Sequence, residues 1–362
     1  MPRPNSFRTC LLAWYDAHAR DLPWRENRDP YRVWVSEIML QQTRVAAVIA
    51  HYHEFLRRFP TVSKLAAARE ASVLAAWSGL GYYRRARMLH RAAKVVVREL
   101  GGKFPGTAEG WRELPGIGRY TAAAIASIAC GERVAVVDGN VERVLQRVSG
   151  RRLAGEELWR TAEALLEPER PGDFNQAMME LGATVCTPRG PACLTCPVVE
   201  LCATRGEMAG SAKSHRQKKR DIHYALSRRD GEVFLVQRPR DARLMPGMWE
   251  LPEIPSGAKA RPQPEPSIAA LKRCATQKQI PPELSPRERL RAGRNDKANR
   301  PPSRLLFTLR HSITVTDFTV QVWRGGAPAQ AAGEWIAARR LSKLAMTGLA
   351  RKILRRAAGQ RR

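Results

Sequence analysis

Four cysteines lie close together near the middle of the sequence, and their spacing indicates a metal centre. Gaps of six, two and five residues separate them, and prolines within the stretch stiffen the loop. They are Cys186, Cys193, Cys196 and Cys202. Thiolates this close together bind either a tetrahedral zinc ion or a cubane iron–sulfur cluster. Structural zinc sites usually combine two short-spaced pairs, so the pattern favours the cluster, and it favours either metal over four unliganded core thiols.

Two acidic residues stand where a carboxyl group could do acid–base chemistry. Asp138, in VVDGNVERVL, precedes a helical pattern, and N–H groups at a helix start hold a carboxylate in its ionised form. An ordinary N-cap has the same position. Glu37 lies in the apolar segment VSEIMLQQT, where burial would raise its affinity for a proton. A buried Glu37 could then donate a proton to a leaving group, whereas a solvent-facing glutamate is the alternative.

A glycine pair separates two helical patterns in LPGIGRYTAAAIASIA, residues 114–129. Gly116 and Gly118 permit a tight turn and let a phosphate approach the N–H groups at the start of the next helix. The pattern is typical of a helix-hairpin-helix that binds the DNA backbone, although a turn without a ligand looks the same.

The charge of the chain favours nucleic acid as a partner. Lys and Arg number 62 against 34 Asp and Glu, a net charge of +28, which exceeds what solubility requires. No run of about 18 uncharged apolar residues is present, and the start MPRPNSFRTC lacks the apolar segment of a secretory signal. We therefore expect a soluble, monomeric, cytoplasmic protein associated with the nucleoid, without a membrane partner.

The first 200 residues predict a helical scaffold for these groups. A length of 362 residues suggests two compact units, and from Asn5 to about Leu201 apolar residues recur three and four apart. Asp29 predicts an N-cap with Pro30 at the first helical position, opening a helical run to residue 59. Further helices are predicted at 62–77, 83–100, 119–130, 140–149, 156–167 and 173–185. Only the apolar run VAVV before Asp138 suggests a strand.

The composition changes near residue 203. We predict a basic linker over 203–220 and a small α+β domain over 221–362. IHYALSR and EVFLVQR on either side of the turn RDG predict a hairpin, and LLFTL and ITVTDFTVQVW predict later strands. Residues 255–303 hold nine prolines and no aromatic residue, which predicts a disordered insertion. The basic segment 351–362 is expected to fray or to screen nucleic acid.

Several short strings occur in a characteristic order along the chain. They are PWR at 23–25, SEIMLQQT, GLGYYRRAR at 79–87, LPGIG followed by VDGNVERV, NQAMMELGATVC, and LMPGMWELP at 244–252. Over residues 7–253 and 304–358 the chain resembles the MutY-type adenine DNA glycosylases of the endonuclease III, or helix-hairpin-helix, superfamily. The resemblance implies a multidomain protein. An all-α glycosylase domain with an iron–sulfur loop would occupy 1–202, and a small α+β, Nudix-like domain would follow the linker.

The resemblance implies roles for three residues and for the cysteines. Glu37 matches the general acid that protonates adenine N7, and Asp138 matches the carboxylate that stabilises or captures the oxocarbenium sugar. Tyr120 stands where bifunctional relatives carry a Schiff-base lysine, so strand cleavage should be weak or absent. The four cysteines match the ligands of a structural 4Fe-4S cluster.

Contacts with DNA and with the base are also implied. Gln42 and Tyr82 match residues that wedge into the duplex beside the extruded nucleotide, and the pair Gly116 and Gly118 matches the hairpin. Arg189, inside the cysteine loop, has the place of a basic residue directed toward DNA. Three residues match positions that line the adenine pocket: Arg25, Asn140 and Glu180.

The C-terminal domain resembles the module that contacts 8-oxoguanine in this family. It lacks a Nudix catalytic box with its run of glutamates, so nucleotide pyrophosphatase activity is not expected. Family members often carry Phe-Ser-His where this chain has Ile313-Thr314-Val315. Thr314 keeps the hydroxyl and is the candidate for lesion recognition.

We therefore predict a monofunctional base-excision repair glycosylase. Its substrate would be double-stranded DNA with adenine mispaired with 8-oxoguanine or guanine, and its product an abasic site. The alternatives are a bifunctional endonuclease III-like glycosylase and AP lyase, and a DNA-binding protein without catalysis.

Overall fold

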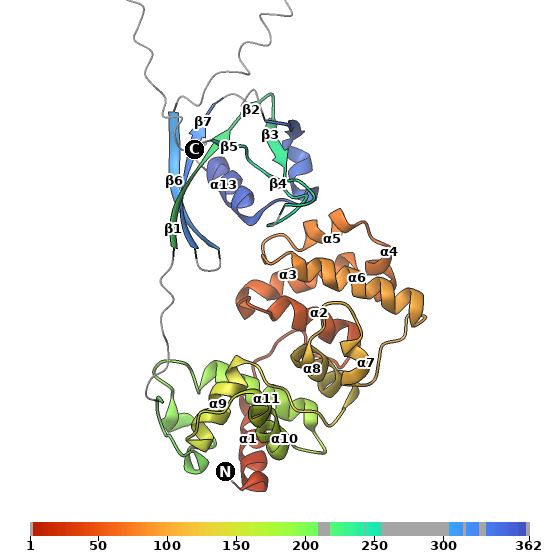
Figure 1. Ribbon diagram of the computed structural model, residues 1–362, viewed down its shortest axis with the longest axis vertical. Helices are drawn as coiled ribbons and strands as arrows, with labels where there is room; N and C mark the ends of the chain where they lie inside the picture. Colours follow the sequence, from red (N-terminus) through yellow and green to blue (C-terminus); the bar gives the residue numbers. More distant parts are fainter. Residues whose placement is uncertain are drawn as a thin grey trace, which may run out of the picture. The chain divides into compact units, whose positions relative to one another are not determined.

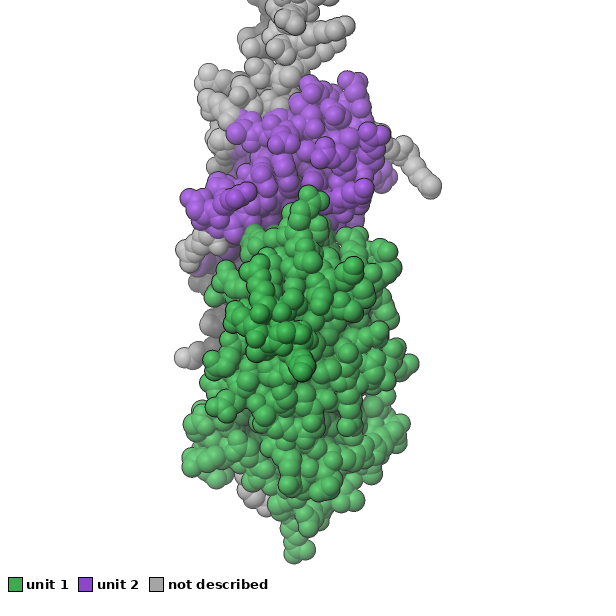
Figure 2. Space-filling view, turned by 90° about the vertical axis from the view of Figure 1, so that its right-hand side faces the viewer, with its two compact units in different colours: residues 1–213 green, residues 214–362 purple. Residues whose placement is uncertain are grey.

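The chain divides into two compact units, coloured separately in Figure 2. They are Met1–Lys213 and Ser214–Arg362. The structure, a computed structural model, describes residues 3–208, 218–242, 244–254, 304–313, 316–325 and 331–359. Much of the predicted linker, the predicted insertion over 255–303 and Thr314 therefore lie outside the described residues. No helix in the described part of the chain is long and apolar enough to cross a membrane.

Unit 1 is built from α-helices joined by turns (Figure 1). They are α1 (Pro4–His18), α2 (Pro30–Leu40), α3 (Val45–Arg58), α4 (Val62–Ala67), α5 (Glu70–Ala76), α6 (Arg84–Glu99), α7 (Ala108–Arg112), α8 (Arg119–Cys130), α9 (Gly139–Ser149), α10 (Gly155–Leu165) and α11 (Pro171–Thr184). Two 3-10 turns follow, η1 (Cys193–Thr195) and η2 (Val199–Leu201). The all-α prediction for this region is confirmed. The run VAVV forms no strand, because the Val136 N–H donates to the Asn175 side chain and not to a neighbouring strand.

Helix α2 begins where the sequence predicts. The Asp29 carboxylate accepts a hydrogen bond from the Arg32 N–H at 2.8 Å, and Pro30 occupies the first turn. The side chain thereby satisfies one of the N–H groups that a helix start leaves without a partner.

Two predicted helices are each broken into two. The run from 30 to 59 is wrong as a single helix, because Gln42 has a φ of 54° and a left-handed residue cannot continue a right-handed helix. The predicted helix 62–77 is interrupted at Ala68, which has an extended backbone. Apolar periodicity continues through both breaks, so the sequence pattern alone does not reveal them.

Helix α8 lies at the junction of the two helical layers of unit 1. It packs against α2 and α7 on one side and against α11 on the other (Figure 1). The first layer buries aromatic side chains such as Trp34, Trp77 and Trp111. In the second, α1, α9, α10 and α11 share an apolar core with fully buried members such as Phe7 and Leu181.

Unit 2 consists of two four-stranded sheets and a helix. Its elements are β1 (Lys218–Leu226), β2 (Arg228–Arg229), β3 (Glu232–Gln237), β4 (Trp249–Glu250), β5 (Glu253–Ile254), β6 (Arg304–Ile313), β7 (Thr316–Arg324), β8 (Gly333–Ala337), the 3-10 helix η4 (Ala338–Lys343) and α13 (Gly348–Gly359). One sheet has the order β5-β1-β7-β6, with β1 and β7 parallel; in the other, β3 pairs with β2, β4 and β8. Both sheets and α13 contribute side chains to one core, so the α+β prediction is confirmed.

Two predictions for unit 2 need correction. The turn at Asp230 and Gly231 joins β2 to β3, but of the predicted first strand, IHYALSR, only Arg228 lies in β2. Ile222–Leu226 lie in β1, which pairs with β5 and β7 in the other sheet. The basic C-terminal segment is not a fraying tail through residue 359. It forms most of α13, which buries Ile353 and Leu354 in the core of the unit.

Candidate active site

A single cavity in unit 1 contains both carboxylates that the sequence singles out. It has a volume of about 340 Å³, and its walls come from the segment between α1 and α2, from α2, α8 and α11, and from the start of α9. Glu37 reaches it from α2, Tyr120 from α8, and Asp138 from the N-cap of α9. Residues about 100 positions apart along the chain thus meet where the two layers adjoin.

Glu37 is buried and not solvent-facing, with 6% of its surface exposed. Burial raises its pKa to about 7, the hydrogen bond from Tyr120 opposes this rise, and the charge of Asp138 adds to it. The Tyr120 hydroxyl donates to Glu37 Oε2 at 2.9 Å and lies 3.5 Å from the Met179 sulfur. Burial and the Glu37 charge raise the pKa of Tyr120 well above its usual range, so the phenol keeps its proton. The Glu37 carboxyl can therefore hold a proton near neutral pH.

Asp138 has a different environment although it faces the same cavity. It caps α9 and accepts hydrogen bonds from the backbone N–H groups of Asn140 and Val141 at 2.9 and 2.8 Å. The Asn140 side chain donates to its other oxygen at 2.9 Å. Three N–H donors and the helix start stabilise the anion.

Asn140 connects Asp138 to a neighbouring arginine. Its amide oxygen accepts a hydrogen bond from Arg143 at 2.7 Å, while its NH2 group donates a hydrogen bond to Asp138. Both ends of the side chain are therefore occupied by partners within the protein.

Glu180 lies on α11 at the wall of the cavity and pairs with two arginines. Arg20 donates to it from Nε and, at 2.8 Å, from Nη2, and Arg25 Nη2 donates to it at 2.9 Å. Burial raises the pKa of Glu180, but the two guanidinium groups outweigh burial and hold this pKa below its ordinary value. The pair of cations keeps the buried carboxylate charged.

The residues predicted to contact DNA lie outside the centre of the cavity. Gln42 lines its edge and is exposed; Tyr82 is 46% exposed and is not part of the wall. Gly116 lies in the turn between α7 and α8, and Gly118 is the N-cap of α8. Arg189 is exposed in the cysteine loop.

The wall residues that the sequence analysis did not single out include Arg20, Gln176 and Met179. Gln176 accepts a hydrogen bond from Arg25 at 3.2 Å. A signal existed, because Gln176, Met179 and Glu180 are three and four positions apart and so share one face of α11. Arg20 lies in an irregular segment, and no periodic pattern marks it.

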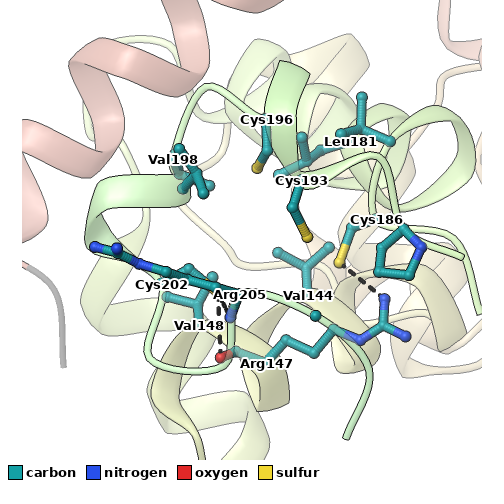
Figure 3. A pocket seen from close by; sticks show the side chains of 14 residues that line it. Val144, Arg147, Val148, Leu181, Cys186, Cys193, Cys196, Val198, Cys202 and Arg205 are labelled. Carbon is teal, nitrogen blue, oxygen red and sulfur yellow. Dashed lines mark hydrogen bonds between the residues drawn. The ribbon is translucent and has the colours of Figure 1, made fainter.

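The four cysteines line one pocket beside α9 and α11 (Figure 3). Apolar side chains such as Val144, Val148 and Leu181 complete its wall. Arg147 Nη1 donates to the Cys186 sulfur at 3.3 Å, and the Arg205 N–H donates to the Cys202 sulfur at 3.5 Å. Hydrogen bonds of this kind stabilise negative charge on sulfur, as metal-bound thiolates require.

These thiols do not converge like the ligands of a single ion. Within the described residues, no group of three His, Cys, Asp or Glu side chains could hold a metal ion. A cubane cluster places its own atoms between the thiolates and therefore holds them farther apart than one zinc ion does. Four thiols in one pocket, two of them with N–H donors, are a donor set that suits a thiolate-bound metal centre.

Comparison with known proteins agrees with this fold. Residues 35–168 match the model of the HhH-GPD superfamily base excision DNA repair proteins. A solved structure of a thermostable thymine-DNA glycosylase is 31% identical, with a TM-score of 0.53, and the match covers 56% of this chain and 96% of that one. The adenine DNA glycosylase of Schizosaccharomyces pombe is 32% identical in an alignment of 327 positions, and the match covers 71% of each chain. The chain belongs to the adenine DNA glycosylase family.

Some relatives in the family are matched over less than two thirds of their length. The human adenine DNA glycosylase is 42% identical in an alignment of 315 positions, and the match covers 69% of this chain and 58% of the human protein. The chain thus spans less than two thirds of that relative.

Proposed function

We propose that this chain is a DNA glycosylase that hydrolyses the N-glycosidic bond of adenine mispaired with 8-oxoguanine or guanine. The observation that carries the proposal is the pair of carboxyl groups, Glu37 and Asp138, with different environments in one cavity. Because the chain belongs to the adenine DNA glycosylase family, we propose adenine as the base that is released. Glycoside hydrolysis commonly divides its work between one protonated and one ionised carboxyl group.

The two carboxyl groups act on opposite ends of the bond. Glu37, protonated near neutral pH, donates a proton to adenine N7, so the base leaves without its negative charge. Positive charge develops on the sugar as the bond breaks. Asp138, held by the N–H groups at the start of α9, stabilises this charge until water adds at C1′.

We infer that the enzyme is monofunctional. Strand cleavage of the lyase type needs an amine that forms a Schiff base with the sugar. Among the described residues that line the cavity there is no lysine, and Tyr120 uses its hydroxyl on Glu37. The product is then an abasic site in an intact strand.

Double-stranded DNA is the proposed partner. The net charge of +28 supplies attraction to phosphates. The N-terminus of α8 with Gly118 would receive a phosphate, and Arg189 would contact the backbone from the cysteine loop. Gln42 and Tyr82, both exposed, would fill the space left when adenine leaves the stack.

We assign Arg25, Asn140 and Glu180 to the base pocket in distinct ways. The buried Glu180 carboxylate with its Arg25 partner forms a polar wall for the purine. Asn140 holds Asp138 by its NH2 group and therefore positions the anion.

The cofactor we propose is a 4Fe-4S cluster held by Cys186, Cys193, Cys196 and Cys202. Support comes from the shared pocket and from the N–H groups directed at two of the sulfurs. The cluster would cross-link a loop that has no regular structure except short 3-10 turns. Its contribution is structural, because it lies apart from the cavity that holds the carboxylates.

For unit 2 we propose recognition of the base opposite adenine. The α+β fold agrees with a Nudix-like module, and Thr314 is the proposed contact with 8-oxoguanine. This assignment rests on the sequence resemblance.

Asp138→Asn tests the proposal. Because it removes the anion and keeps the shape, base release should fall about 1000-fold or more while duplex binding changes little. Duplexes with adenine opposite 8-oxoguanine, guanine, cytosine or thymine, and with thymine opposite guanine, are incubated and analysed for strand breaks before and after hot alkali. Glu142→Gln, an exposed acid on the same helix, is the matched control and should behave like the wild type.

Three results would contradict parts of this assignment. Normal turnover by Asp138→Asn would refute the role of the carboxylate pair. Borohydride trapping of a covalent DNA adduct would favour a bifunctional enzyme. Tight binding without release of any base would favour a DNA-binding protein without catalysis.

A further inference from the structure

Gln42 and Tyr82 are exposed residues of unit 1 with left-handed backbones, and they lie on different segments. Gln42 has a φ of 54° in the turn after α2, and Tyr82 has a φ of 46° in the turn before α6. Such φ values are costly for residues other than glycine, and they persist only where surrounding contacts enforce them. A contact that enforces both turns would also fix the position of one side chain relative to the other.

Arg85, in the first turn of α6, makes the contacts that enforce the turn after α2. Its Nη1 donates to the carbonyl oxygens of Ile38 and Met39 at 2.8 and 2.9 Å, and also to that of Gln41. Its Nη2 donates to the Thr43 hydroxyl at 3.0 Å. The Ile38 and Met39 carbonyls lie in the last turn of α2, where no further helical N–H group reaches them, so the guanidinium takes the place of the next helical turn.

The same guanidinium holds the turn before α6. Nη2 lies 3.2 Å from the carbonyl oxygen of Leu80 and 3.4 Å from that of Gly81. The guanidinium carbon is 5.5 Å from the ring centres of both Trp77 and Tyr82. The Arg85 side chain therefore binds the backbone of both turns. It also contacts the ring of Tyr82 directly.

We propose that Arg85 is a positioning residue that holds Gln42 and Tyr82 as a matched pair for insertion into the DNA duplex. The inference rests on the proposed function, which assigns these two residues to the space left by the extruded base. Arg85 is not among the residues that line the cavity of Glu37 and Asp138, so it is assigned no contact with the base or the reacting atoms. Arg85 affects base release by fixing the conformation of the two turns that carry Gln42 and Tyr82.

A lysine cannot replace this guanidinium. Arginine offers a planar set of N–H groups, and the acceptors here come from two separate segments; a lysine ammonium has three donors and no plane to stack on Tyr82. Arg85→Lys keeps the charge but releases part of both turns. Displacements of about 1 Å at a reacting centre lower rates about 100-fold, so we expect a loss of about 10- to 100-fold in base release.

The test is a mutant cycle that separates positioning from general stability. Arg85→Lys is introduced into the wild type and into the Gln42→Ala/Tyr82→Ala background, and single-turnover adenine release is measured in both. If Arg85 acts through the pair, its substitution costs about 10- to 100-fold in the wild type and less than about twofold in the background that lacks the pair. An equal loss in both backgrounds would overturn the proposal. Arg91→Lys, an exposed arginine on the same helix, is the control and should change neither rate.

A second readout does not depend on chemistry. A duplex with 2-aminopurine in place of the adenine becomes more fluorescent when that base leaves the stack. Arg85→Lys should reduce this increase at saturating protein, and an unchanged increase would overturn the proposal. If the wild type released no base at all, the proposed function would fail while the fluorescence would still test Arg85.

A milder substitution, Thr43→Val, tests the proposal even if Arg85→Lys prevents folding. Thr43→Val removes one acceptor of Arg85 and leaves the guanidinium in place. It should lower base release less than Arg85→Lys and lose its effect in the Gln42→Ala/Tyr82→Ala background. If Thr43→Val still lowered base release in that background, the proposed action of Arg85 through Gln42 and Tyr82 would be contradicted.

Discussion

Glu37 and Asp138 carry the same chemical group, and their surroundings give the two groups different properties. Glu37 is enclosed by α2 and α8 and has one hydrogen-bond donor, the Tyr120 hydroxyl. Asp138 has three N–H donors and a helix start. Burial, which the single hydrogen bond from Tyr120 offsets only in part, favours the neutral form of Glu37. One cavity thus offers both a proton and a negative charge.

The rate of base release should depend on the protonation of Glu37. Because burial raises its pKa to about 7, the acid is present below pH 7 and is lost above it. Single-turnover rates should therefore be nearly constant well below pH 7, be about halved at pH 7, and fall about tenfold per pH unit well above it. A rate that rises through this range would contradict the role of general acid.

The protonation of Glu37 should also affect the free energy of unfolding of the protein in the absence of DNA. Between the ordinary glutamate pKa of 4.5 and the folded value of about 7, the folded state retains a proton that the unfolded state has lost. The folded state is therefore progressively destabilised as pH rises through this window. Glu37→Gln, which cannot ionise, should gain on the order of 3 kcal/mol in free energy of unfolding over the wild type between pH 4 and pH 8. Denaturant unfolding at both pH values measures the difference.

At the scale of elements, the two glycines in the turn between α7 and α8 have different structural roles. Gly116 has a φ of 81°, and a Cβ there would lie 2.4 Å from the Met88 Cβ. Gly118 has an ordinary φ of −94°, and a Cβ there would meet nothing within 4 Å. The first glycine is required by the fold, whereas the second leaves an open approach to the start of α8.

Alanine substitutions at the two glycines should therefore differ. Gly116→Ala should lower the free energy of unfolding by roughly 1–3 kcal/mol, because of its left-handed backbone and the clash with Met88. Gly118→Ala should stay within about 1 kcal/mol of the wild type, since only a modest N-cap preference is lost. If a phosphate binds there, Gly118→Ala should nevertheless weaken duplex binding. Denaturant unfolding and fluorescence anisotropy measure the two effects, and unchanged binding by Gly118→Ala would contradict a phosphate site.

At the scale of the whole molecule, charge and architecture serve different purposes. Each unit has an apolar core of its own. The net charge of +28 belongs to the chain as a whole and concerns association rather than fold. Attraction of this kind is not specific for sequence, so the discrimination of a mispair must come from contacts with bases.

Binding to an undamaged duplex should accordingly depend steeply on salt. If six or more phosphates are contacted, the affinity should fall about 1000-fold or more between roughly 50 and 200 mM salt. The single-turnover rate at saturating protein should change far less, because the carboxylates lie in a cavity and are less screened. Anisotropy titrations at several salt concentrations give the slope, and a slope near zero would contradict binding through phosphates.

The sequence by itself determined the features that depend on neighbours along the chain. The N-caps at Asp29 and Asp138 lie where the sequence predicts them, because capping involves residues only two or three positions apart. The cysteine spacing indicated a metal centre for the same local reason, and helical periodicity predicted an all-α first unit. The ordered strings then indicated the family.

Only the tertiary structure decided what depends on distant segments. Burial of Glu37 and its raised pKa follow from α8 packing against α2, which periodicity within α2 cannot show. The break at Gln42 was not predicted, because the carbonyl groups it exposes are bound by Arg85 from α6. β1 lies in the sheet opposite to β3 because its partners, β5 and β7, lie farther along the chain. Hydrogen bonds and burial act through space, and only the folded chain brings their partners within reach.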